Sequence, residues 1–381
     1  MSKHGRILVA MSGGIDSSLA AVMLHEEGYE VIGMTMKTWD YASSGSSKKE
    51  TGCCSLDSIN DARNIAVNLG FPHYILDIRE EFGDYVIDHF TGEYLEGRTP
   101  NPCVLCNTHI KWDSLLRRAD KLDCELIATG HYANVREVGS SKENSRFVIS
   151  KGIDTWKDQS YVLWGVSQES LARTKLPLGN LKKSEIREMA TQKEFYDLVN
   201  KKESYEICFV PDNDYRGFLK RRVEGLEERV KGGNFVLEDG KVVGKHEGYP
   251  FYTIGQRKGL GIAFGTPMFV TEIRKDTNEV VLGHEKSLDK DGMMVGKIVM
   301  QKYANLNGLS LETNTKIRYK HEGSPATITQ DGDKMKVIFK EPVSGIAPGQ
   351  AAVFYEGDDV VGGGWILKSF NQNSVFEQAQ N

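Results

Sequence analysis

Hydrophobic and polar positions follow two different periods in the first two hundred residues of the chain. Four short apolar runs predict strands, and they lie at Ile7–Ala10, Val31–Met36, His73–Asp77 and Leu126–Thr129. The segments between them, such as Ser17–Glu27 and Ile59–Leu69, carry apolar residues three and four positions apart, which predicts helices. This alternation predicts an α/β domain in which a parallel sheet has helices on both faces.

The pattern changes after about Asn200, where alternating apolar and polar positions become the rule. They predict further strands at Pro267–Ile273, Glu279–Gly283, Thr315–Tyr319, Lys334–Phe339 and Ala351–Tyr355. Glycine-containing turns such as Asp331–Asp333 separate these strands, which is typical of a small barrel or sandwich. We expect an α/β domain over residues 1–207, a small central domain over 208–291 and a β-barrel-like domain over 292–381.

Composition narrows the function classes. The 381 residues carry 48 Lys and Arg against 53 Asp and Glu, a net charge of −5, which excludes a uniformly basic nucleic-acid coat but not a local basic face. Six cysteines are too few for a disulfide-stapled secreted scaffold. The sequence has no apolar run long enough for a membrane span, and its first strand begins at Arg6. We therefore expect a cytoplasmic protein with no membrane partner and no targeting segment.

A glycine turn joins the first predicted strand to the first predicted helix. It reads Ser12-Gly13-Gly14-Ile15-Asp16-Ser17-Ser18, and its glycines and the helix N-terminus favour a bound phosphate. Asp16 is a candidate ligand for a metal that bridges phosphates. The turn lacks the spacing of a Walker A loop and of a dinucleotide-binding loop. A serine-capped helix without a ligand is the alternative. The string resembles the pyrophosphate-binding loop of the N-type ATP pyrophosphatases, which makes the first domain a nucleotide-binding domain.

Three cysteines are candidates for chemistry. Cys103 and Cys106 lie three positions apart after two prolines, and Cys208 lies far along the chain. We expect proline to keep this segment out of a helix until Cys106, where a helix start would favour the thiolate. A buried cysteine or half of a zinc site, completed by Cys53–Cys54, is the alternative. Cys124 is expected to pack in the core.

Seven ordered motifs resemble the tRNA-specific 2-thiouridylase family, and the resemblance covers nearly the whole chain. They are SGGIDSS at 12–18, Met34–Lys37, GRTPNPCVLCN at 97–107, ATGHY at 128–132, KDQSY at 157–161, GQRKGLG at 255–261 and EPVSGIAPGQAAVFY at 341–355. The resemblance implies ATP-dependent 2-thiolation of the wobble uridine of tRNA, with Mg²⁺ as the cofactor and with AMP and pyrophosphate released. Sulfur would arrive from an upstream persulfide donor protein. The central domain over 208–291 would bind tRNA or link the other two domains.

The same resemblance implies roles for individual residues. Cys208 would carry the persulfide, and Cys106 would resolve it by forming a disulfide with Cys208. ATP would contact Ala10, Met11, Ser12, Gly13, Gly14, Ile15, Asp16, Ser17, Met36 and Gly130. The tRNA would contact Asn101, Pro102, Cys103, His131, Lys157, Asp158, Gln159, Arg318, Tyr319 and Gln350. His131 is either a proton carrier or a structural residue. Basic runs at Lys182–Lys183, Lys201–Lys202 and Lys220–Arg222 either bind RNA or are solvated helix faces.

Cys103 departs from the family pattern, which has aspartate at this position. A thiol cannot replace a carboxylate, because its reference pKa lies several units higher and it accepts hydrogen bonds weakly. Cys103, Cys106 and Cys208 are therefore candidate ligands of a 4Fe–4S cluster whose fourth iron holds sulfide. The alternative is the persulfide route with Cys103 as a spare thiol. Cys53 and Cys54 either relay sulfur or merely flank a turn.

Two other function classes compete with thiolation. One is a small-molecule ATP-pyrophosphatase ligase similar to argininosuccinate synthetase, against which the paired cysteines and the β-rich C-terminal third argue. The other is a non-catalytic module that binds tRNA or an iron–sulfur cluster, against which the intact phosphate-loop string argues.

Overall fold

The computed structural model describes residues 2–39, 55–139, 145–201, 207–210 and 212–372. Its contacts divide the chain into two compact units, each built from separate stretches of sequence. The first unit holds residues up to 87, residues 103–214 and residues 358–360. The second holds residues 88–102, 215–357 and those from 361 onward. The two boundaries between the three domains expected from the sequence remain predictions.

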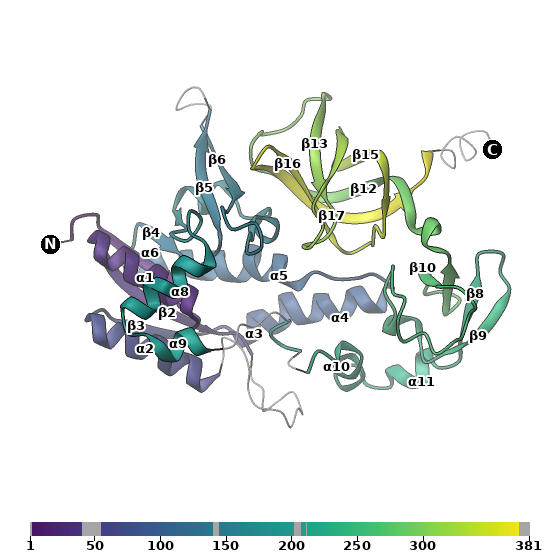
Figure 1. The fold of residues 1–381 in the computed structure, drawn as a ribbon, viewed down its shortest axis with the longest axis horizontal. Coiled ribbons are helices and arrows are strands. Elements are labelled where there is room, and N and C mark those ends of the chain that lie inside the picture. The colour runs from purple at the N-terminus through teal and green to yellow at the C-terminus, as the bar shows by residue number, and fades with distance from the viewer. Residues whose placement is uncertain (1, 40–54, 140–144, 202–206, 211, 373–381) are drawn as a thin grey trace. The chain divides into compact units, whose positions relative to one another are not determined.

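A five-stranded sheet forms the centre of the first unit (Figure 1). Its strand order is β3-β2-β1-β4-β7, and every neighbouring pair is parallel. The strands are β1 (Arg6–Ala10), β2 (Glu30–Lys37), β3 (His73–Asp77), β4 (Leu126–Ala128) and β7 (Thr174–Lys175). The first four coincide with the strands predicted from the apolar runs.

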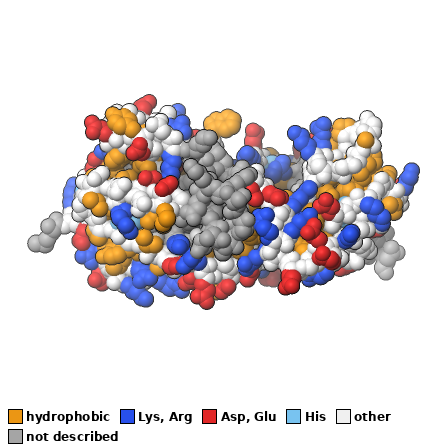
Figure 2. Space-filling view, turned by 90° about the horizontal axis from the view of Figure 1, so that it is seen from below, with side chains coloured by type: hydrophobic (Ala, Val, Ile, Leu, Met, Phe, Trp, Pro, Cys, Tyr) orange, Lys and Arg blue, Asp and Glu red, His pale blue; other side chains and the backbone are white. Residues whose placement is uncertain are grey.

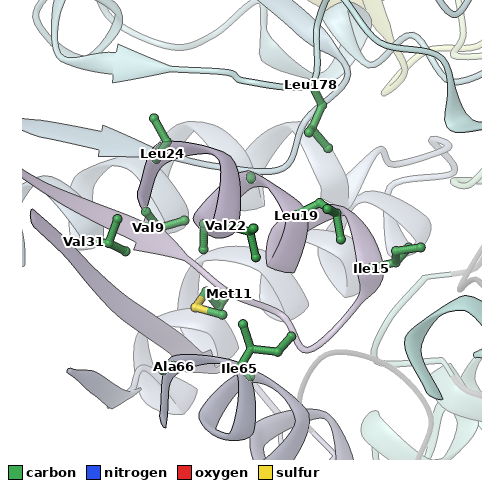
Figure 3. Close-up of a cluster of buried hydrophobic side chains, with 14 of the residues drawn as sticks. Val9, Met11, Ile15, Leu19, Val22, Leu24, Val31, Ile65, Ala66 and Leu178 are labelled. Carbon is green, nitrogen blue, oxygen red and sulfur yellow. The ribbon is translucent and has the colours of Figure 1, made fainter. Parts of the chain in front are cut away.

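Helices cover both faces of this sheet, as the sequence predicts. Alternate residues of β1, Ile7 and Val9, join Met11 in a buried cluster beneath the helices of one face, part of which Figure 3 shows. Those helices are α1 (Ile15–Glu27), α2 (Leu56–Leu69), α8 (Lys183–Gln192) and α9 (Tyr196–Asn200). On the other face, α6 (Trp112–Lys121) packs on β1 and β4 through the buried Trp112 and Leu115.

The segment that carries Cys103 and Cys106 is helical throughout, so one expectation was wrong. Helix α5 begins at Pro102 and runs to Leu105, and a π-helical turn over Cys106–Lys111 continues directly into α6. Proline lacks an N–H, but the first helical residue needs none, and the fixed φ of proline suits that position. Pro102 therefore starts the helix instead of delaying it. A second π-helical turn, Gly83–Ile87, follows α3 (Arg79–Phe82).

The rest of the first unit is a hairpin and a short helix. Strands β5 (Ala133–Val138) and β6 (Arg146–Lys151) pair antiparallel, and α7 (Gln168–Ala172) packs on β6. Arg136 on β5 donates to both carboxylate oxygens of Asp359 at 2.8 Å, and Ser150 on β6 donates to the same carboxylate. This ion pair fixes residues 358–360 to the hairpin.

The second unit contains a barrel and a smaller sheet. Six strands close the barrel in the order β12-β15-β14-β13-β16-β17, because β12 also pairs with β17. They are β12 (Asp289–Met300), β13 (Ser310–Lys316), β14 (Ser324–Asp331), β15 (Lys334–Ser344), β16 (Ala351–Glu356) and β17 (Asp359–Phe370). The predicted β-barrel is confirmed. The strand predicted at Thr315–Tyr319 was misplaced, since β13 ends at Lys316 and leaves Arg318 and Tyr319 in the following turn.

The smaller sheet and three helices complete the second unit. The sheet has the order β10-β11-β8-β9, and its β11–β8 pair is parallel. Its strands are β8 (Gly233–Leu237), β9 (Val242–His246), β10 (Phe269–Arg274) and β11 (Glu279–Gly283). The helices are α4 (Asp88–Leu95), α10 (Tyr215–Arg222) and α11 (Leu226–Val230).

Two surface properties bear on partners. None of the helices in the described ranges is both long enough and apolar enough to cross a membrane. On the face drawn in Figure 2, Lys and Arg side chains are interspersed with Asp and Glu side chains. This face therefore offers no broad basic field to a polyanion.

Candidate active site at the phosphate loop and the cysteine helix

The glycine turn after β1 is a tightly closed loop. The Ser12 backbone N–H donates to Ser17 Oγ at 3.0 Å, and Ser17 Oγ lies 3.2 Å from the Gly14 carbonyl, to which it donates. Gly13 has φ +67°, the left-handed conformation that favours glycine. Helix α1 starts immediately afterwards, so its first N–H groups, which have no intrahelical partner, point toward the loop. The loop therefore has the donors and the helix dipole that bind phosphate.

Two glycines let other elements approach this loop closely. A Cβ on Gly13 would lie 1.9 Å from the Ser58 carbonyl oxygen of α2. A Cβ on Gly130, which follows β4, would lie 2.7 Å from the Ser17 backbone nitrogen. The ends of β1 and β4 thus meet at the carboxyl edge of the sheet, where ligands of parallel α/β sheets bind. Met36 lies near the end of the neighbouring strand β2.

Replacing Gly13 with alanine is expected to destabilise the folded chain by about 3 kcal/mol or more. A left-handed conformation costs about 1–2 kcal/mol once a Cβ is present, and the clash with α2 adds an overpacking cost. The matched control is Gly14→Ala, because Gly14 has φ −96° and its Cβ would lie 3.5 Å from Ser12 Oγ. Thermal unfolding without nucleotide should separate the two variants, and equal unfolding midpoints would contradict the assigned loop geometry.

Asp16 of the loop is held by two residues that the sequence patterns did not single out for this purpose. Lys183 Nζ donates to both Asp16 carboxylate oxygens, at 2.7 and 2.8 Å, and the Tyr132 hydroxyl donates to Oδ1 at 2.6 Å. Lys183 is buried at 8% exposure, so this is an internal ion pair. Lys201 Nζ donates in turn to the Gly13 carbonyl at 3.1 Å and to Asp61 at 2.8 Å. Two lysines from distant parts of the sequence therefore bond to the phosphate loop.

These contacts change the interpretation of the basic runs. Lys183 does not belong to a solvated helix face, because it is buried and paired with Asp16. Lys220 pairs with Glu227 at 2.8 Å, and Arg222 pairs with Asp88 at 2.7 Å. Most cations of the three runs are therefore engaged with carboxylates of the same unit. Lys202 lies outside the described residues.

The two cysteine segments pack against one helix. The π-helical turn that begins at Cys106 packs on α3 and on the π-helical turn after it. Phe209, which follows Cys208, is buried at 1% exposure and contacts Phe82 of α3 edge-on, with ring centroids 5.8 Å apart. Cys106 and Cys208 are both half-buried, whereas Cys103 is exposed. Helix α3 thus brings two segments about a hundred residues apart in the sequence to the same part of the first unit.

The charge of Lys111 acts on the pKa values of both His131 and Cys103. Burial lowers the pKa of His131 well below its usual range, and the charge of Lys111 adds to this shift, so the ring is neutral at pH 7. Thr129 Oγ1 lies 2.6 Å from His131 Nδ1. Cys103 is exposed, but desolvation by the surrounding protein raises the pKa of its thiol. The charge of Lys111 lowers this pKa by a smaller amount. Cys103 is therefore a protonated thiol and a poor nucleophile at neutral pH.

The remaining cysteines are straightforward to place. Cys124 is buried at 2% exposure, as expected for core packing, and burial raises the pKa of its thiol to about 11. Cys53 and Cys54 lie outside the described residues. Across the described ranges, no three Cys, His, Asp or Glu side chains converge as metal ligands. Cys103, Cys106 and Cys208 thus do not form the three-thiolate site that a cluster would require.

Some of the residues expected to contact tRNA form hydrogen bonds within the protein. Asp158 accepts hydrogen bonds from the backbone N–H groups of Gly152 and Ser160, both at 3.1 Å. Gln159 Oε1 accepts from the Tyr132 N–H at 3.0 Å. Their side-chain oxygens therefore hold the segment in shape and place the half-buried Lys157 beside it. The RNA contacts themselves remain predictions.

In the second unit, Gln350 positions the loop that leads to the cysteine helix. Its Nε2 donates to the carbonyls of Thr99 and Pro100 at 3.2 and 3.1 Å, directly before Asn101 and Pro102. Arg318 and Tyr319 are exposed in the turn after β13, and Arg318 donates to the Ser344 carbonyl at 3.3 Å. The expected tRNA residues are therefore distributed over both units.

Sequence reasoning missed Lys183, Lys201, Tyr132 and Lys111 as parts of the site. Lys183 lies 167 residues from Asp16, so no local spacing connects them. Tyr132 lies within the ATGHY motif at 128–132, which was a usable signal because the motif follows a strand at the edge where ligands bind. Lys201 and Lys111 had no signal beyond their charge.

Comparisons with known proteins cover almost the whole chain. Residues 5–212 match the family described as tRNA methyl transferase HUP domain, residues 216–284 the tRNA methyl transferase PRC-barrel domain, and residues 291–366 the aminomethyltransferase beta-barrel domain. A tRNA-specific 2-thiouridylase MnmA from Cytophaga hutchinsonii is 73% identical, covering 98% of this chain and 100% of the relative. Relatives with the same name from Amoebophilus asiaticus and Salinibacter ruber are 71% and 58% identical, and they cover 97% and 96% of this chain and 97% and 95% of their own lengths.

Proposed function

The chain belongs to the tRNA-specific 2-thiouridylase family, a family of tRNA-uridine 2-sulfurtransferases, and we propose that it thiolates C2 of the wobble uridine of tRNA at the expense of ATP. The observation that carries the proposal is the pairing of two features within the first unit. A phosphate loop occupies the carboxyl edge of the sheet, and two cysteine segments pack on one helix, α3. ATP activation and sulfur transfer need both.

ATP is the substrate of the first step. The uridine O2 would attack the α-phosphorus of ATP, and pyrophosphate would leave, which converts O2 into a good leaving group. The loop N–H groups and the N-terminus of α1 would hold the phosphates. Lys183, already beside Asp16, would neutralise charge that develops on the departing pyrophosphate.

Magnesium fits this loop as an ion carried with the nucleotide. Mg²⁺ usually binds through one or two carboxylates together with substrate phosphates. Asp16 is the carboxylate of the loop, and it would hold the ion there. Bound Mg²⁺ would supply charge neutralisation to the phosphates.

Sulfur transfer would follow at the cysteine segments. The terminal sulfur of a Cys208 persulfide would attack C2, and AMP would leave. The Cys106 thiolate would then attack Cys208 Sγ, break the sulfur–sulfur bond, leave sulfur on the uridine and form a Cys106–Cys208 disulfide. An external thiol reductant would reopen the disulfide, and a persulfide donor protein would reload Cys208.

Cys103 takes a different role from the aspartate of the family pattern. Because its thiol stays protonated, it would donate a hydrogen bond to the target base instead of accepting a proton. The described residues do not offer the three-ligand group of a cluster, so no step is assigned to one.

Protein purified without oxygen is accordingly expected to contain no stoichiometric iron or acid-labile sulfide. Iron and sulfide assays, together with absorption spectra after attempted reconstitution, check this prediction. A stable brown cluster that Cys103→Ser removes would contradict it and would restore the cluster alternative.

One reconstitution tests the proposed function. Unmodified tRNA with a wobble uridine, ATP, Mg²⁺ and a persulfide donor are incubated with the protein, and the nucleosides are analysed for 2-thiouridine. The expected product requires all four components. Pyrophosphate release with a small-molecule acceptor in place of tRNA would indicate a ligase, and tRNA binding without pyrophosphate release would indicate a non-catalytic module.

A further inference from the structure

Trp156 is the feature of the surface that the proposed site leaves unexplained. It is 93% exposed, whereas Trp112 and Trp164 are buried and the other two of the five tryptophans are half-buried. Tryptophan is highly buried on average, because water solvates its large ring poorly. A ring held almost wholly in solvent is therefore costly unless a partner covers it.

The backbone beneath Trp156 is fixed. Asp154 Oδ1 accepts from the N–H groups of Trp156 and Lys157 at 3.1 and 3.2 Å, and the Asp154 carbonyl accepts from the Lys157 N–H at 3.0 Å. The other oxygen, Oδ2, accepts from the Lys183 N–H at 2.9 Å, which ties the turn to the start of α8. The ring is thus presented from a braced turn and loses little backbone freedom on binding.

Two lysines lie close to Trp156 along the chain or at the helix start to which its turn is bonded. Lys157 is the next residue, and Lys182 is exposed directly beside the point where Asp154 bonds to α8. The carboxylates of Asp154, Asp158 and Glu185 in the same region each accept backbone N–H groups, which draws on part of their negative charge. An exposed aromatic ring with lysines nearby matches the combination of base stacking and phosphate attraction that binds unpaired nucleotides.

We propose that Trp156 is a stacking platform for an unpaired base of the tRNA, with Lys157 and Lys182 holding the adjoining phosphates. The proposal rests on the proposed function, because it takes the RNA substrate from there. The proposal places a binding contact next to the phosphate loop, because Lys183 bonds to both segments. Its backbone N–H donates to Asp154, and its ammonium group donates to Asp16.

The test measures binding of an unmodified tRNA transcript over a range of salt concentrations. Trp156→Ala should weaken binding about tenfold at every salt concentration, because stacking does not release counterions. Trp156→Phe keeps an aromatic face and should stay within about twofold of the wild type. Lys157→Ala should weaken binding. It should also lower the slope of log affinity against log salt concentration by the amount expected for about one phosphate contact. Val67→Ala, at a position 70% exposed on α2, is the control for loss of exposed apolar area.

Fluorescence supplies an independent readout. Acrylamide should quench Trp156 most strongly in the free protein, and tRNA should protect it. The part of the fluorescence that tRNA protects from acrylamide should be missing in Trp156→Phe. A fully base-paired RNA duplex should neither protect the ring nor distinguish Trp156→Ala from the wild type.

The outcomes separate this proposal from the one on which it rests. Wild-type binding by Trp156→Ala, or unchanged quenching with tRNA, would overturn the platform while thiolation by the wild type still stands. A lower unfolding temperature in Trp156→Ala would overturn the stacking platform, because it would show that Trp156 stabilises the fold. Failure of the wild-type protein to bind tRNA would overturn both.

Discussion

Replacing Cys208 with serine is expected to lower 2-thiouridine formation by at least about a hundredfold, because a hydroxyl cannot carry the sulfane sulfur or attack C2 as a thiolate. The same variant should bind ATP and release pyrophosphate on tRNA at a rate close to that of the wild type. The phosphate loop and its bonds to Lys183 and Tyr132 do not involve residue 208. Single-turnover assays with a preloaded sulfur donor would measure both steps.

Cys124→Ser is the matched control for this change. It makes the same substitution at a thiol that is buried at 2% exposure and whose pKa is raised to about 11, so the thiol is protonated and inaccessible to tRNA. Thiolation should therefore persist in Cys124→Ser. Cys106→Ser should instead trap tRNA on Cys208 through the transferred sulfur, which reducing agents would release. Thiolation retained by Cys208→Ser would overturn the assignment of the persulfide.

The elements of the first unit were predictable because their signals are local. The continuous apolar run of β1 follows from its burial on both faces of the sheet, and the three-and-four spacing of α2 follows from burial of one face of that helix. Pro102 was misjudged because proline has two opposite effects. It breaks a helix interior, yet it suits the first helical residue, and only tertiary packing decides which position it takes.

The candidate site was predictable where a motif is contiguous and not where it is assembled by the fold. The phosphate loop is one string, and the structure gives it the expected close turn. Its partners come from distant positions, since Lys183 is 167 residues from Asp16 and Lys201 is 188 residues from Gly13. Charge patterns assigned these lysines to the surface, because a run of cations without structural context is most often solvated.

Replacing Asp16 with asparagine is expected to reduce both stability and ATP turnover. Lys183 would keep a charge in a side chain only 9% exposed, without its carboxylate partner. Breaking a buried pair costs about 3–5 kcal/mol, and the 33% exposure of the Asp16 side chain places this case near the lower end. Pyrophosphate release should fall by at least about a hundredfold, because the loop loses the carboxylate that pairs with Lys183 and that we propose as the Mg²⁺ ligand.

Adding Lys183→Met to this variant separates the two effects. Methionine fills the volume of the lysine stem without its charge, so the double variant should regain most of the lost stability. ATP turnover should stay low, because neither the carboxylate nor the cation returns. Lys193→Met, which breaks the surface pair of Lys193 with Glu26 just beyond α8, should change stability by less than about 1 kcal/mol. Recovery of pyrophosphate release together with stability would mean that the Asp16–Lys183 pair serves folding alone, and another group would then have to stabilise the departing pyrophosphate.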